Sequence, residues 1–356
     1  MVLEIQKYSR YVRRSLLNRG GLSYFILYVT SGCNSACRTC FFYQNLNRSD
    51  DLSLQEYKKI SQKLGVVSVL LLSGGEPFVR ADLNEICRHF INNNKIDTLS
   101  IPTNGILSDK IAQVSESLAK EFGNTVISIN PSLDGMRDYH DMIRGVPGNF
   151  DRVVETIKKM EEIKRRYRNI QIIVNSVVNR DNIGEIRKLI VFLEQFNLDY
   201  HALEIMRGER KDNHLKLPEV AAVKELHRFM VERRERRIKN IFEKIIVIGS
   251  LKYIYRMKEN LLEGKPWPIR CAAGECIAVV YPNGDFSLCE LKKPLGNLRD
   301  NGYDVHAMLR SKEARNGVAD IEDTRCSCTH ICFLNASVAR DWKSIFKIPF
   351  HYFKND

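Results

Sequence analysis

The stretch YFILYVTSGCNSACRTC, residues 24–40, joins one strand-like segment to a run of cysteines, and the elements around it decide the fold. Its first seven residues are apolar and largely β-branched or aromatic, which predicts a buried strand. Cys33, Cys37 and Cys40 follow at once, in the spacing C-x3-C-x2-C. Because parallel α/β folds bind ligands at the carboxyl ends of their strands, this order predicts three thiols at the active edge of such a fold.

The same kind of strand recurs five times downstream, each time separated from the next by a stretch of helical periodicity. Ser53, Asp82, Ser108 and Asn182 are expected to cap the intervening helices at their amino ends. Six βα units in series predict a parallel sheet, either an incomplete barrel or a doubly wound sheet. The expected strands are residues 24–30, 66–73, 98–104, 125–131, 170–178 and 200–206.

The alternation stops after Met206, and the composition then changes twice. A strongly basic stretch with helical periodicity comes first, and a Pro-containing joint leads from it into a cysteine-rich segment with short strand and turn signals. We expect five parts: a basic N-terminal helix (1–21), a barrel-like α/β domain (22–212), a basic helical connector (213–264), a cysteine-rich α+β domain (265–340) and an aromatic, basic tail (341–356).

The bulk composition is that of an ordinary globular protein, with 44% hydrophobic and 28% charged residues among 356. No run of 18 apolar residues and no secretory signal pattern is present, so a cytoplasmic protein is expected. The net charge of +12 suits a nucleic acid, a membrane surface, an anionic substrate or an acidic redox partner. No nucleic-acid-binding module is recognisable, so that partner is not expected.

The ten cysteines are unevenly distributed along the chain. Three fall between Cys33 and Cys40, six between Cys271 and Cys332, and only Cys87 stands apart, in an apolar helical pattern typical of a core thiol. A reducing compartment favours metal or redox chemistry over disulfides. Three thiolates binding four irons would leave one iron open for substrate chemistry, whereas a structural zinc ion, the other interpretation, needs a fourth ligand.

The cysteine run in this position resembles the signature of the radical S-adenosylmethionine (SAM) superfamily. The resemblance implies a partial (β/α)6 TIM-like barrel and a [4Fe–4S] cluster on Cys33, Cys37 and Cys40 whose fourth iron binds SAM. It also implies that one electron, from a reductase with flavodoxin or ferredoxin, cleaves SAM to a 5′-deoxyadenosyl radical. The sequence departs from the family at Thr39, where an aromatic residue is common; Phe41 and Phe42 are candidates to replace it beside the adenine.

A second stretch, LLLSGGEPFVR at residues 70–80, strengthens the resemblance. Gly74 and Gly75 permit close backbone approach to a ligand, and Glu76 can accept hydrogen bonds from an ammonium group. In the family, the corresponding stretch holds the amino group of SAM. The ends of later strands supply further residues that the resemblance assigns to SAM, although each also suits a turn or a helix cap: Asn104, Ser132, Arg144 and Asn175.

The cysteines beyond residue 270 resemble the SPASM/Twitch extension of radical SAM enzymes, which binds one or two auxiliary iron–sulfur clusters. Six cysteines are present where the full pattern has seven, so one auxiliary [4Fe–4S] cluster is expected. The preferred ligands are Cys271, Cys289, Cys328 and Cys332, with Cys276 and Cys326 as alternates. A structural zinc knuckle is the other interpretation of this cluster.

Glu290 directly follows one of these cysteines. In the anaerobic sulfatase-maturating enzymes that the chain resembles, an acidic residue next to a cluster cysteine acts as a base. The resemblance therefore makes Glu290 a candidate general base for the substrate.

The substrate is not defined by these motifs. Only 32 residues precede Cys33, which favours a small-molecule, sugar or lipid-linked substrate over a ribosomal peptide; oxidation, epimerisation and radical coupling all stay open. A peptide or protein maturase is the alternative enzyme, and a metal-binding nucleic-acid regulator is the non-enzyme alternative. The tail DWKSIFKIPFHYFKND and the basic N-terminal helix are suited to peripheral contact with the inner face of a membrane, or else to packing on the barrel.

Overall fold

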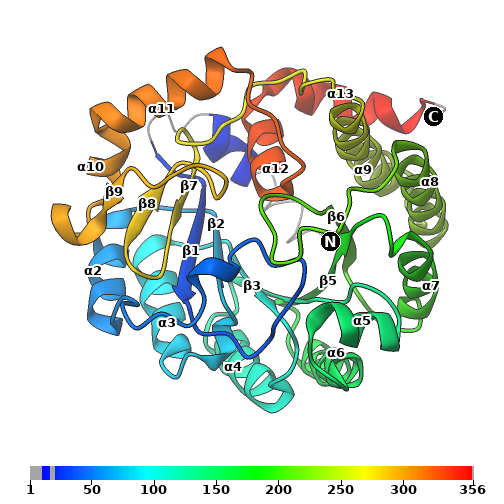
Figure 1. Ribbon diagram of the computed structural model, residues 1–356, viewed down its shortest axis with the longest axis horizontal. Helices are drawn as coiled ribbons and strands as arrows, with labels where there is room; N and C mark the ends of the chain where they lie inside the picture. Colours follow the sequence, from blue (N-terminus) through cyan, green and yellow to red (C-terminus); the bar gives the residue numbers. More distant parts are fainter. Residues whose placement is uncertain (1–9, 17–20, 355–356) are drawn as a thin grey trace.

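The computed structural model describes residues 10–16 and 21–354 (Figure 1). Residues 10–16 are helical; of the predicted N-terminal helix, residues 1–9 and 17–20 lie outside the described residues. Arg10 and Arg14 form ion pairs with Asp97 at 3.0 and 2.8 Å. Asp97 immediately precedes a sheet strand, so this helical segment is fastened to the amino-terminal edge of the sheet, away from the cysteine run.

Six parallel strands form the larger part of the sheet, in the spatial order β6-β5-β4-β3-β2-β1. A helical segment follows each strand, and the resulting unclosed α/β barrel confirms the predicted fold class (Figure 1). Two of the predicted strands match in both bounds, and the other four agree at each end within three residues. The strands are β1 (Tyr24–Thr30), β2 (Val69–Gly74), β3 (Thr98–Thr103), β4 (Val126–Pro131), β5 (Ile170–Val178) and β6 (Tyr200–Ile205).

The barrel helices begin close to the predicted positions. Ser53 forms a complete capping box with Glu56, while Asp82 and Asn182 occupy N-cap positions without a side-chain cap. Ser108 was the wrong cap: its helix has Leu107 at the N-cap, and the Ser108 hydroxyl donates to Glu155 instead, at 3.1 Å. The elements are η1 (Tyr43–Asn45), α2 (Leu54–Leu64), η2 (Pro77–Val79), α3 (Leu83–Asn94), α4 (Ser108–Glu121), α5 (Arg137–Arg144), α6 (Asn149–Arg166) and α7 (Ile183–Leu193).

The strands of the cysteine-rich segment continue the barrel sheet. β7 pairs with β1 in parallel, with Tyr24 opposite Ile277, and β8 and β9 then add in antiparallel fashion to complete nine strands. The carboxyl-terminal cysteines are thereby attached to the strand that precedes Cys33. The remaining elements are α8 (Val220–Arg237), α9 (Ile241–Leu262), β7 (Ile277–Val280), β8 (Asp285–Ser287), β9 (Gly296–Asn297), η3 (Leu298–Asn301), α10 (Val305–Arg310), α11 (Lys312–Asp323), α12 (Ile331–Arg340) and α13 (Trp342–Tyr352).

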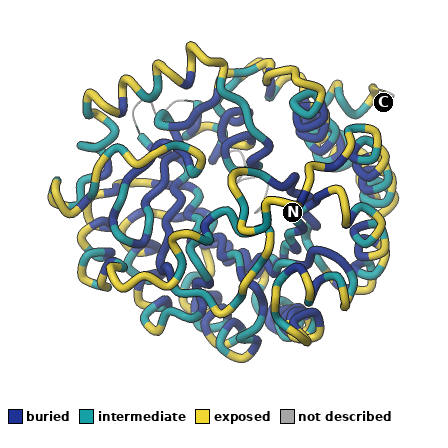
Figure 2. The backbone as a smooth tube through the Cα atoms, in the orientation of Figure 1, coloured by how far each residue is buried: buried dark blue, intermediate teal, exposed yellow. Residues whose placement is uncertain are grey.

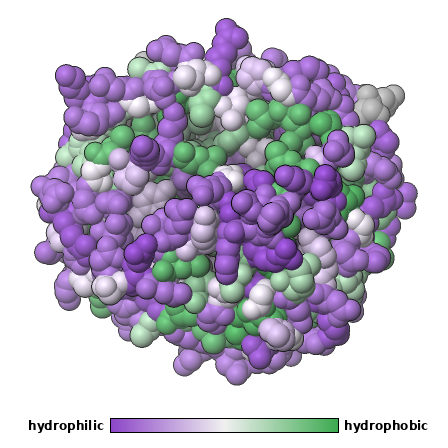
Figure 3. All heavy atoms as spheres, viewed as in Figure 1, coloured by the Kyte–Doolittle hydropathy of each residue, from purple (hydrophilic) through white to green (hydrophobic). Residues whose placement is uncertain are grey.

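Strand β5 shows how the sheet separates a helix-facing side from an inner side. Residues 170, 172, 174, 176 and 178 are buried, and the alternate residues are half-buried. Among the half-buried set, Ile173, Asn175 and Val177 line a central cavity. The two-residue period of a strand thus orients a polar side chain inward. Buried residues gather in the interior of the molecule, and exposed ones lie mainly on the outer helices and loops (Figure 2). The surface visible from this side is mainly hydrophilic, with separate hydrophobic patches (Figure 3).

Candidate active site

A large cavity lies at the carboxyl ends of the parallel strands. Its empty volume, with the solvent at its mouth included, is about 1800 Å³. All the residues predicted to bind the first cluster and SAM line this cavity: Cys33, Cys37, Cys40, Gly74, Gly75, Glu76, Asn104, Ser132, Arg144 and Asn175.

The loop that carries the three cysteines is held on several sides by backbone hydrogen bonds. The N–H of Arg38 donates to the carbonyl of Ile143, and the carbonyl of Arg38 accepts from Asp212, both at 2.9 Å. The N–H of Cys33 donates to the Asn47 side chain at 2.9 Å. The carboxyl end of α5, the segment after β6 and the Asn47 side chain therefore fix the cysteine loop in place.

The chemistry of this loop fits an iron–sulfur cluster. Burial raises the pKa of Cys33 to about 12 and also raises that of Cys40, while an Arg144 Nη1 atom lies 3.7 Å from the Cys37 Sγ atom. Such thiols release their protons when they bind iron, and the nearby cation stabilises the thiolates. Within residues 10–16 and 21–354, no three His, Cys, Asp or Glu side chains surround a single ion-sized point. A cluster requires no such convergence, because each thiolate binds a different iron.

Gly74 and Gly75 are required by the protein's own packing. A Cβ atom on Gly74 would lie 2.3 Å from the carbonyl oxygen of Thr30, and one on Gly75 would lie 2.1 Å from that of Gly32. In return, the N–H of Gly75 donates to Thr30 and the N–H of Glu76 to Gly32, both at 2.8 Å. The end of β2 therefore lies directly against the backbone that leads to the cysteines.

Glu76 is buried and is surrounded by donors. Its carboxylate accepts from the N–H groups of Phe78 and Asn104, at 3.1 and 2.6 Å, and from the Thr103 hydroxyl at 2.9 Å. Burial raises the pKa of Glu76 to about 7, although these donors act in the opposite direction. The Asn104 amide also donates to the Asn34 side chain at 2.7 Å, which links Glu76 to the cysteine loop.

Arg144 has a protein partner that the sequence did not indicate. Its Nε atom lies 2.7 Å from a carboxylate oxygen of fully buried Asp134. Burial alone would lower the pKa of Arg144, but Asp134 and Cys37 hold it above the ordinary value. Ser132 forms a parallel bridge with Asn175, which places these two predicted SAM residues side by side on the cavity wall.

Glu290 reaches the same cavity from the carboxyl-terminal segment. Its carboxylate accepts from the Tyr28 hydroxyl at 2.5 Å and lies 2.9 Å from His330 Nδ1 and 3.8 Å from Arg207 Nη2. Burial alone would raise the pKa of Glu290, but His330, Arg207 and Tyr28 together lower it to about 2. Burial lowers the pKa of His330, and the charge of Arg207 acts in the same direction.

The carboxyl-terminal cysteines fall into two places. The pKa of Cys271 is raised by burial and by the nearby Cys326, and that of Cys289 by burial and by Cys328 and Cys271. Burial raises the pKa of Cys328 to about 12, and Cys271 and Cys326 act in the same direction. Cys332 instead lines the central cavity, where its Sγ atom accepts from the Tyr24 hydroxyl at 3.2 Å.

Two further cysteines lie in the hydrophobic core. Cys87 and Cys276 are both fully buried, and the Cys276 Sγ atom lies 3.9 Å from the carbonyl oxygen of Ala336 in α12. Burial raises the pKa of Cys276 to about 12. The predicted alternate ligand Cys276 thus occupies the position of a packed core thiol.

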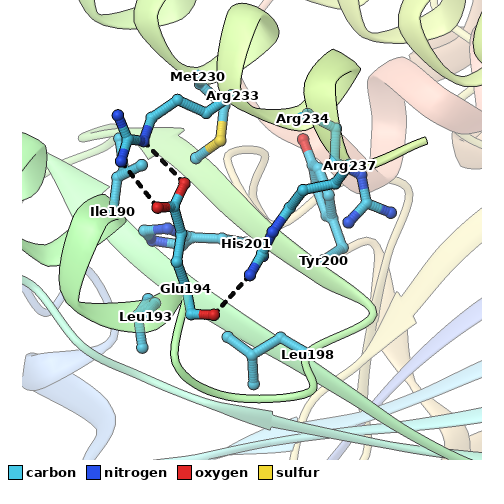
Figure 4. Close-up of a pocket in the computed structure, with 10 residues that line it drawn as sticks. All are labelled: Ile190, Leu193, Glu194, Leu198, Tyr200, His201, Met230, Arg233, Arg234 and Arg237. Carbon is cyan, nitrogen blue, oxygen red and sulfur yellow. Dashed lines mark hydrogen bonds and ion pairs between the residues drawn. The ribbon is translucent and has the colours of Figure 1, made fainter. Parts of the chain in front are cut away.

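A smaller pocket of about 430 Å³ lies outside the barrel, between the end of α7 and α8 (Figure 4). Arg233 binds both carboxylate oxygens of Glu194 at 2.7 Å, and Arg237 donates to the Glu194 carbonyl at 2.5 Å. These arginines of the basic run at 233–240 hold α8 onto α7. The pocket is a helix–helix contact remote from the cysteines.

Residues 27–192 match the family described as the radical SAM superfamily. Together with the unclosed barrel, this match identifies residues 27–192 as a radical SAM domain. The expected resemblance to that superfamily is confirmed, and the non-enzyme alternative is set aside.

Curated relatives extend the comparison. The chain is 24% identical over 316 residues to a GTP 3',8-cyclase of Clostridium perfringens, which covers 85% of this chain and 87% of that protein. It is 28% identical over 192 residues to Fe-coproporphyrin III synthase of Methanosarcina barkeri, covering 52% and 45%. It is also 28% identical over 166 residues to the sporulation killing factor maturation protein SkfB of Bacillus subtilis, covering 46% and 38%. The chain spans less than half the length of the last two.

Solved structures share the fold over most of the chain. Streptococcus suis SuiB bound to S-adenosylmethionine aligns with a TM-score of 0.60 at 16% identity, covering 87% of this chain and 70% of that one. Native anSMEcpe with bound AdoMet aligns with a TM-score of 0.59 at 16% identity, covering 93% and 97%. At these identities the likeness establishes the architecture, including the segment beyond the barrel.

Four residues in or next to the cavity were not predicted as site residues. Asp134, which pairs with the cavity residue Arg144, lies in the SLDG stretch after β4, and an acid at a strand end is the signal that was available there. Arg207 comes two residues after the end of β6. Tyr28 lies in β1 and Glu204 in β6, and the two-residue period of each strand would have selected these cavity-lining side chains.

Replacing Glu76 by Gln tests the raised pKa of this carboxyl. Because the folded-state pKa lies above the value near 4.5 expected in the unfolded chain, Glu76 favours folding at low pH. This contribution is lost as the pH rises through about 7 and amounts to roughly 3 kcal/mol. The free energy of unfolding of the metal-free protein, measured from pH 5 to pH 8, should therefore decline less steeply in Glu76→Gln than in the wild type.

The surface variant Glu116→Gln, on α4, is the matched control and should keep the wild-type slope. An unchanged slope in Glu76→Gln would show that the Glu76 carboxyl is already ionised across this range.

Proposed function

We propose that the chain binds a [4Fe–4S] cluster and SAM in the central cavity and abstracts a hydrogen atom from a small substrate held beside Glu290. One observation carries the proposal: the three loop cysteines, the predicted SAM residues and Glu290 all line the same cavity. When bound, the cluster and SAM would supply a 5′-deoxyadenosyl radical after one-electron reduction by a flavodoxin- or ferredoxin-type donor.

The chain's own residues would hold these groups in defined roles. Cys33, Cys37 and Cys40 would bind three irons. Glu76 would accept from the amino group of SAM, since its carboxylate is buried and already oriented by three donors. Arg144, held by Asp134, would direct a guanidinium nitrogen towards the carboxylate of SAM. Asn104, Ser132 and Asn175 would contact the remainder of SAM from the ends of β3, β4 and β5.

A small polar substrate is favoured by the polar groups that line the cavity, Glu290, Arg207, His330 and Glu204. The two carboxylates can accept from a hydroxyl or an ammonium group, and Arg207 can donate to a hydroxyl. The Arg207 guanidinium stacks 5.0 Å from the ring centre of Phe41, the residue after Cys40. A substrate bound to this group would therefore lie next to the cysteine loop. Relatives named for small-molecule products, the GTP 3',8-cyclase and Fe-coproporphyrin III synthase, support this class.

An extended substrate is the second candidate. A second hollow of about 1060 Å³ shares Phe41, Phe42 and Glu290 with the central cavity. A sugar on a lipid carrier, or a peptide, could place its reacting end in the central cavity and the rest in this hollow. The relative SkfB, named for maturation of a killing factor, supports the peptide.

Glu290 would act mainly as an anchor for the substrate and as an acceptor for its proton. The carboxylate is ionised at neutral pH, so it can accept a proton, and the Tyr28 hydroxyl and His330 imidazole hold it in place. A pKa of about 2 makes it a weaker base than an ordinary carboxylate. Strong hydrogen bonds to hydroxyl or ammonium groups of the substrate are thus its principal proposed contribution.

The auxiliary cluster is proposed on Cys271, Cys289, Cys326 and Cys328. Cys271 raises the pKa of Cys289 and of Cys328, and Cys326 raises the pKa of Cys271 and of Cys328. The pKa of Cys332 is instead affected, after burial, by Glu290, Tyr24, Glu204 and Arg207. This ligand set differs from the set preferred on sequence alone at one position, because Cys326 replaces Cys332. Cys332 is then left free to face the substrate.

The proposed function is tested by SAM cleavage under anaerobic conditions. Iron- and sulfide-reconstituted protein with dithionite should convert SAM to methionine and 5′-deoxyadenosine. Alanine at Cys33, Cys37 or Cys40 should reduce the rate to that of dithionite and SAM alone, because three ligands are needed to hold the cluster. Chromatography of the two products measures the rate.

Cys87→Ala, in the core, is the control and should retain the iron and the cleavage. A wild-type protein that stays colourless, or that holds zinc at Cys33, Cys37 and Cys40, would refute the proposal.

Replacing Glu290 by Gln tests the substrate side of the cavity. The variant keeps the side-chain volume but leaves Arg207 without its buried counter-charge. We expect SAM cleavage within about twofold of the wild type and loss of substrate conversion, by at least about tenfold. The readout is the set of mass-shifted ions that appear when enzyme and SAM are incubated with extract of the source cells. The control variant Glu116→Gln should convert the substrate as the wild type does. Full conversion by Glu290→Gln as well would show that Glu290 does not take part in substrate binding.

The auxiliary ligands are distinguished by comparing Cys326→Ser with Cys332→Ser. After identical reconstitution, Cys326→Ser should lack the iron of one cluster, whereas Cys332→Ser should match the wild type. Iron and sulfide analysis decides between them. Full iron in Cys326→Ser with a loss in Cys332→Ser would restore the sequence-based ligand set.

A further inference from the structure

We propose that α13 and the adjoining start of α9 dock the protein onto the surface of an anionic lipid bilayer. The contact is peripheral, because no helix in the described parts of the chain is long and apolar enough to cross a membrane. This inference goes beyond the proposed function and does not rest on it.

Four aromatic side chains form an exposed stripe along α13. Trp342, Phe346, Phe350 and Phe353 are 57%, 69%, 67% and 69% exposed. Their spacing of four, four and three residues places them on one face of the helix. The opposite face is already buried, with Ser344 at 1% and Ile348 at 5% exposure. The stripe is therefore additional to the face that packs on the protein.

α13 is held firmly against α9, so the stripe has a fixed orientation. A Cβ atom on Gly249 would lie 2.4 Å from the carbonyl oxygen of Ile348, which shows how closely the two helices approach. The hydroxyls of Tyr253 and Ser344 are 2.7 Å apart, and Lys252 donates to the carbonyl of Lys354 at 2.9 Å. An apolar face of this size on a rigid element marks an interaction surface.

A second exposed apolar group lies at the start of α9. Ile241, Phe242 and Ile246 are 53%, 76% and 47% exposed. The Tyr352 hydroxyl, near the end of α13, donates to Glu235, near the end of α8, at 3.0 Å. The carboxyl end of α13 therefore lies beside the α8–α9 connection, as Figure 1 shows, and the two groups belong to neighbouring parts of the surface.

Most of the charges around both groups are positive, although Glu235 and Glu243 lie beside the start of α9. Residues 342–354 contain three lysines, at 343, 347 and 354, and no Asp or Glu. Lys343, Lys347 and Lys354 each directly follow an aromatic residue of the stripe and are exposed, as are Arg236, Arg237 and Lys239 just before α9. Aromatic side chains flanked by lysines are typical of helices that lie in an anionic lipid interface. A second copy of the chain would bring like charges together, which disfavours self-association through this surface.

The described part of the basic N-terminal helix is held by other contacts, since Arg10 and Arg14 are paired with Asp97 at the amino-terminal edge of the sheet. The proposed docking surface consists of α13 with the start of α9.

Vesicle sedimentation of the full-length protein tests the proposal. The wild type should bind phosphatidylcholine vesicles that contain phosphatidylglycerol and should be released by high salt. Phe346→Ser/Phe350→Ser should weaken this binding by at least about tenfold, since two large apolar side chains no longer enter the interface. Lys343→Gln/Lys347→Gln should weaken it by about fivefold per lysine.

Val191→Ser is the matched control, because Val191 is 47% exposed on α7, away from the stripe. It should bind as the wild type does, and all variants should retain wild-type circular dichroism and SAM cleavage. If the Phe variant misfolds, the Lys variant carries the test alone. Equal binding of variants and wild type, absence of wild-type binding, or a dimer that the same substitutions dissociate would each overturn the proposal.

Discussion

The contact between Gly75 and the backbone of Gly32 is the constraint on which the site depends. It allows the end of β2 to lie against the segment that leads from β1 to the cysteines, within hydrogen-bonding distance at two positions. A side chain on either Gly74 or Gly75 would separate the end of β2 from the segment that follows β1. From this contact Glu76 extends into its ring of donors, and Asn104 and Asn34 connect it back to the cysteine loop.

The second half of the chain depends on β1 as well. Because β7 pairs with β1 in parallel, the carboxyl-terminal segment is attached to the strand that carries Tyr24 and Tyr28. Those two side chains contact Cys332 and Glu290 respectively. One strand therefore positions the cysteine loop at its carboxyl end and the residues of the proposed substrate site along its inner face.

Much of this arrangement could be predicted because it is local in sequence. Strands such as β1 and β5 are short apolar runs, and most of the predicted cluster and SAM residues follow strand ends, where a parallel fold gathers them. The choice among the carboxyl-terminal cysteines was not local, since Cys271 and Cys326 meet only after the chain between them has folded. The pairing of Arg144 with Asp134 could not be predicted for the same reason, because it forms only in the folded chain. The sequence shows the aromatic residues of α13 as a pattern. Which side of this helix faces outward depends on where α9 packs against it, and the sequence alone does not give that contact.

The central claim is that a cluster on Cys33, Cys37 and Cys40 keeps one iron open, within reach of SAM held by Glu76. The electron paramagnetic resonance spectrum of reduced, reconstituted protein, recorded before and after adding SAM, tests it most directly. We expect SAM to change the signal of one cluster and Cys37→Ala to abolish this change. A wild-type spectrum identical with and without saturating SAM would contradict it.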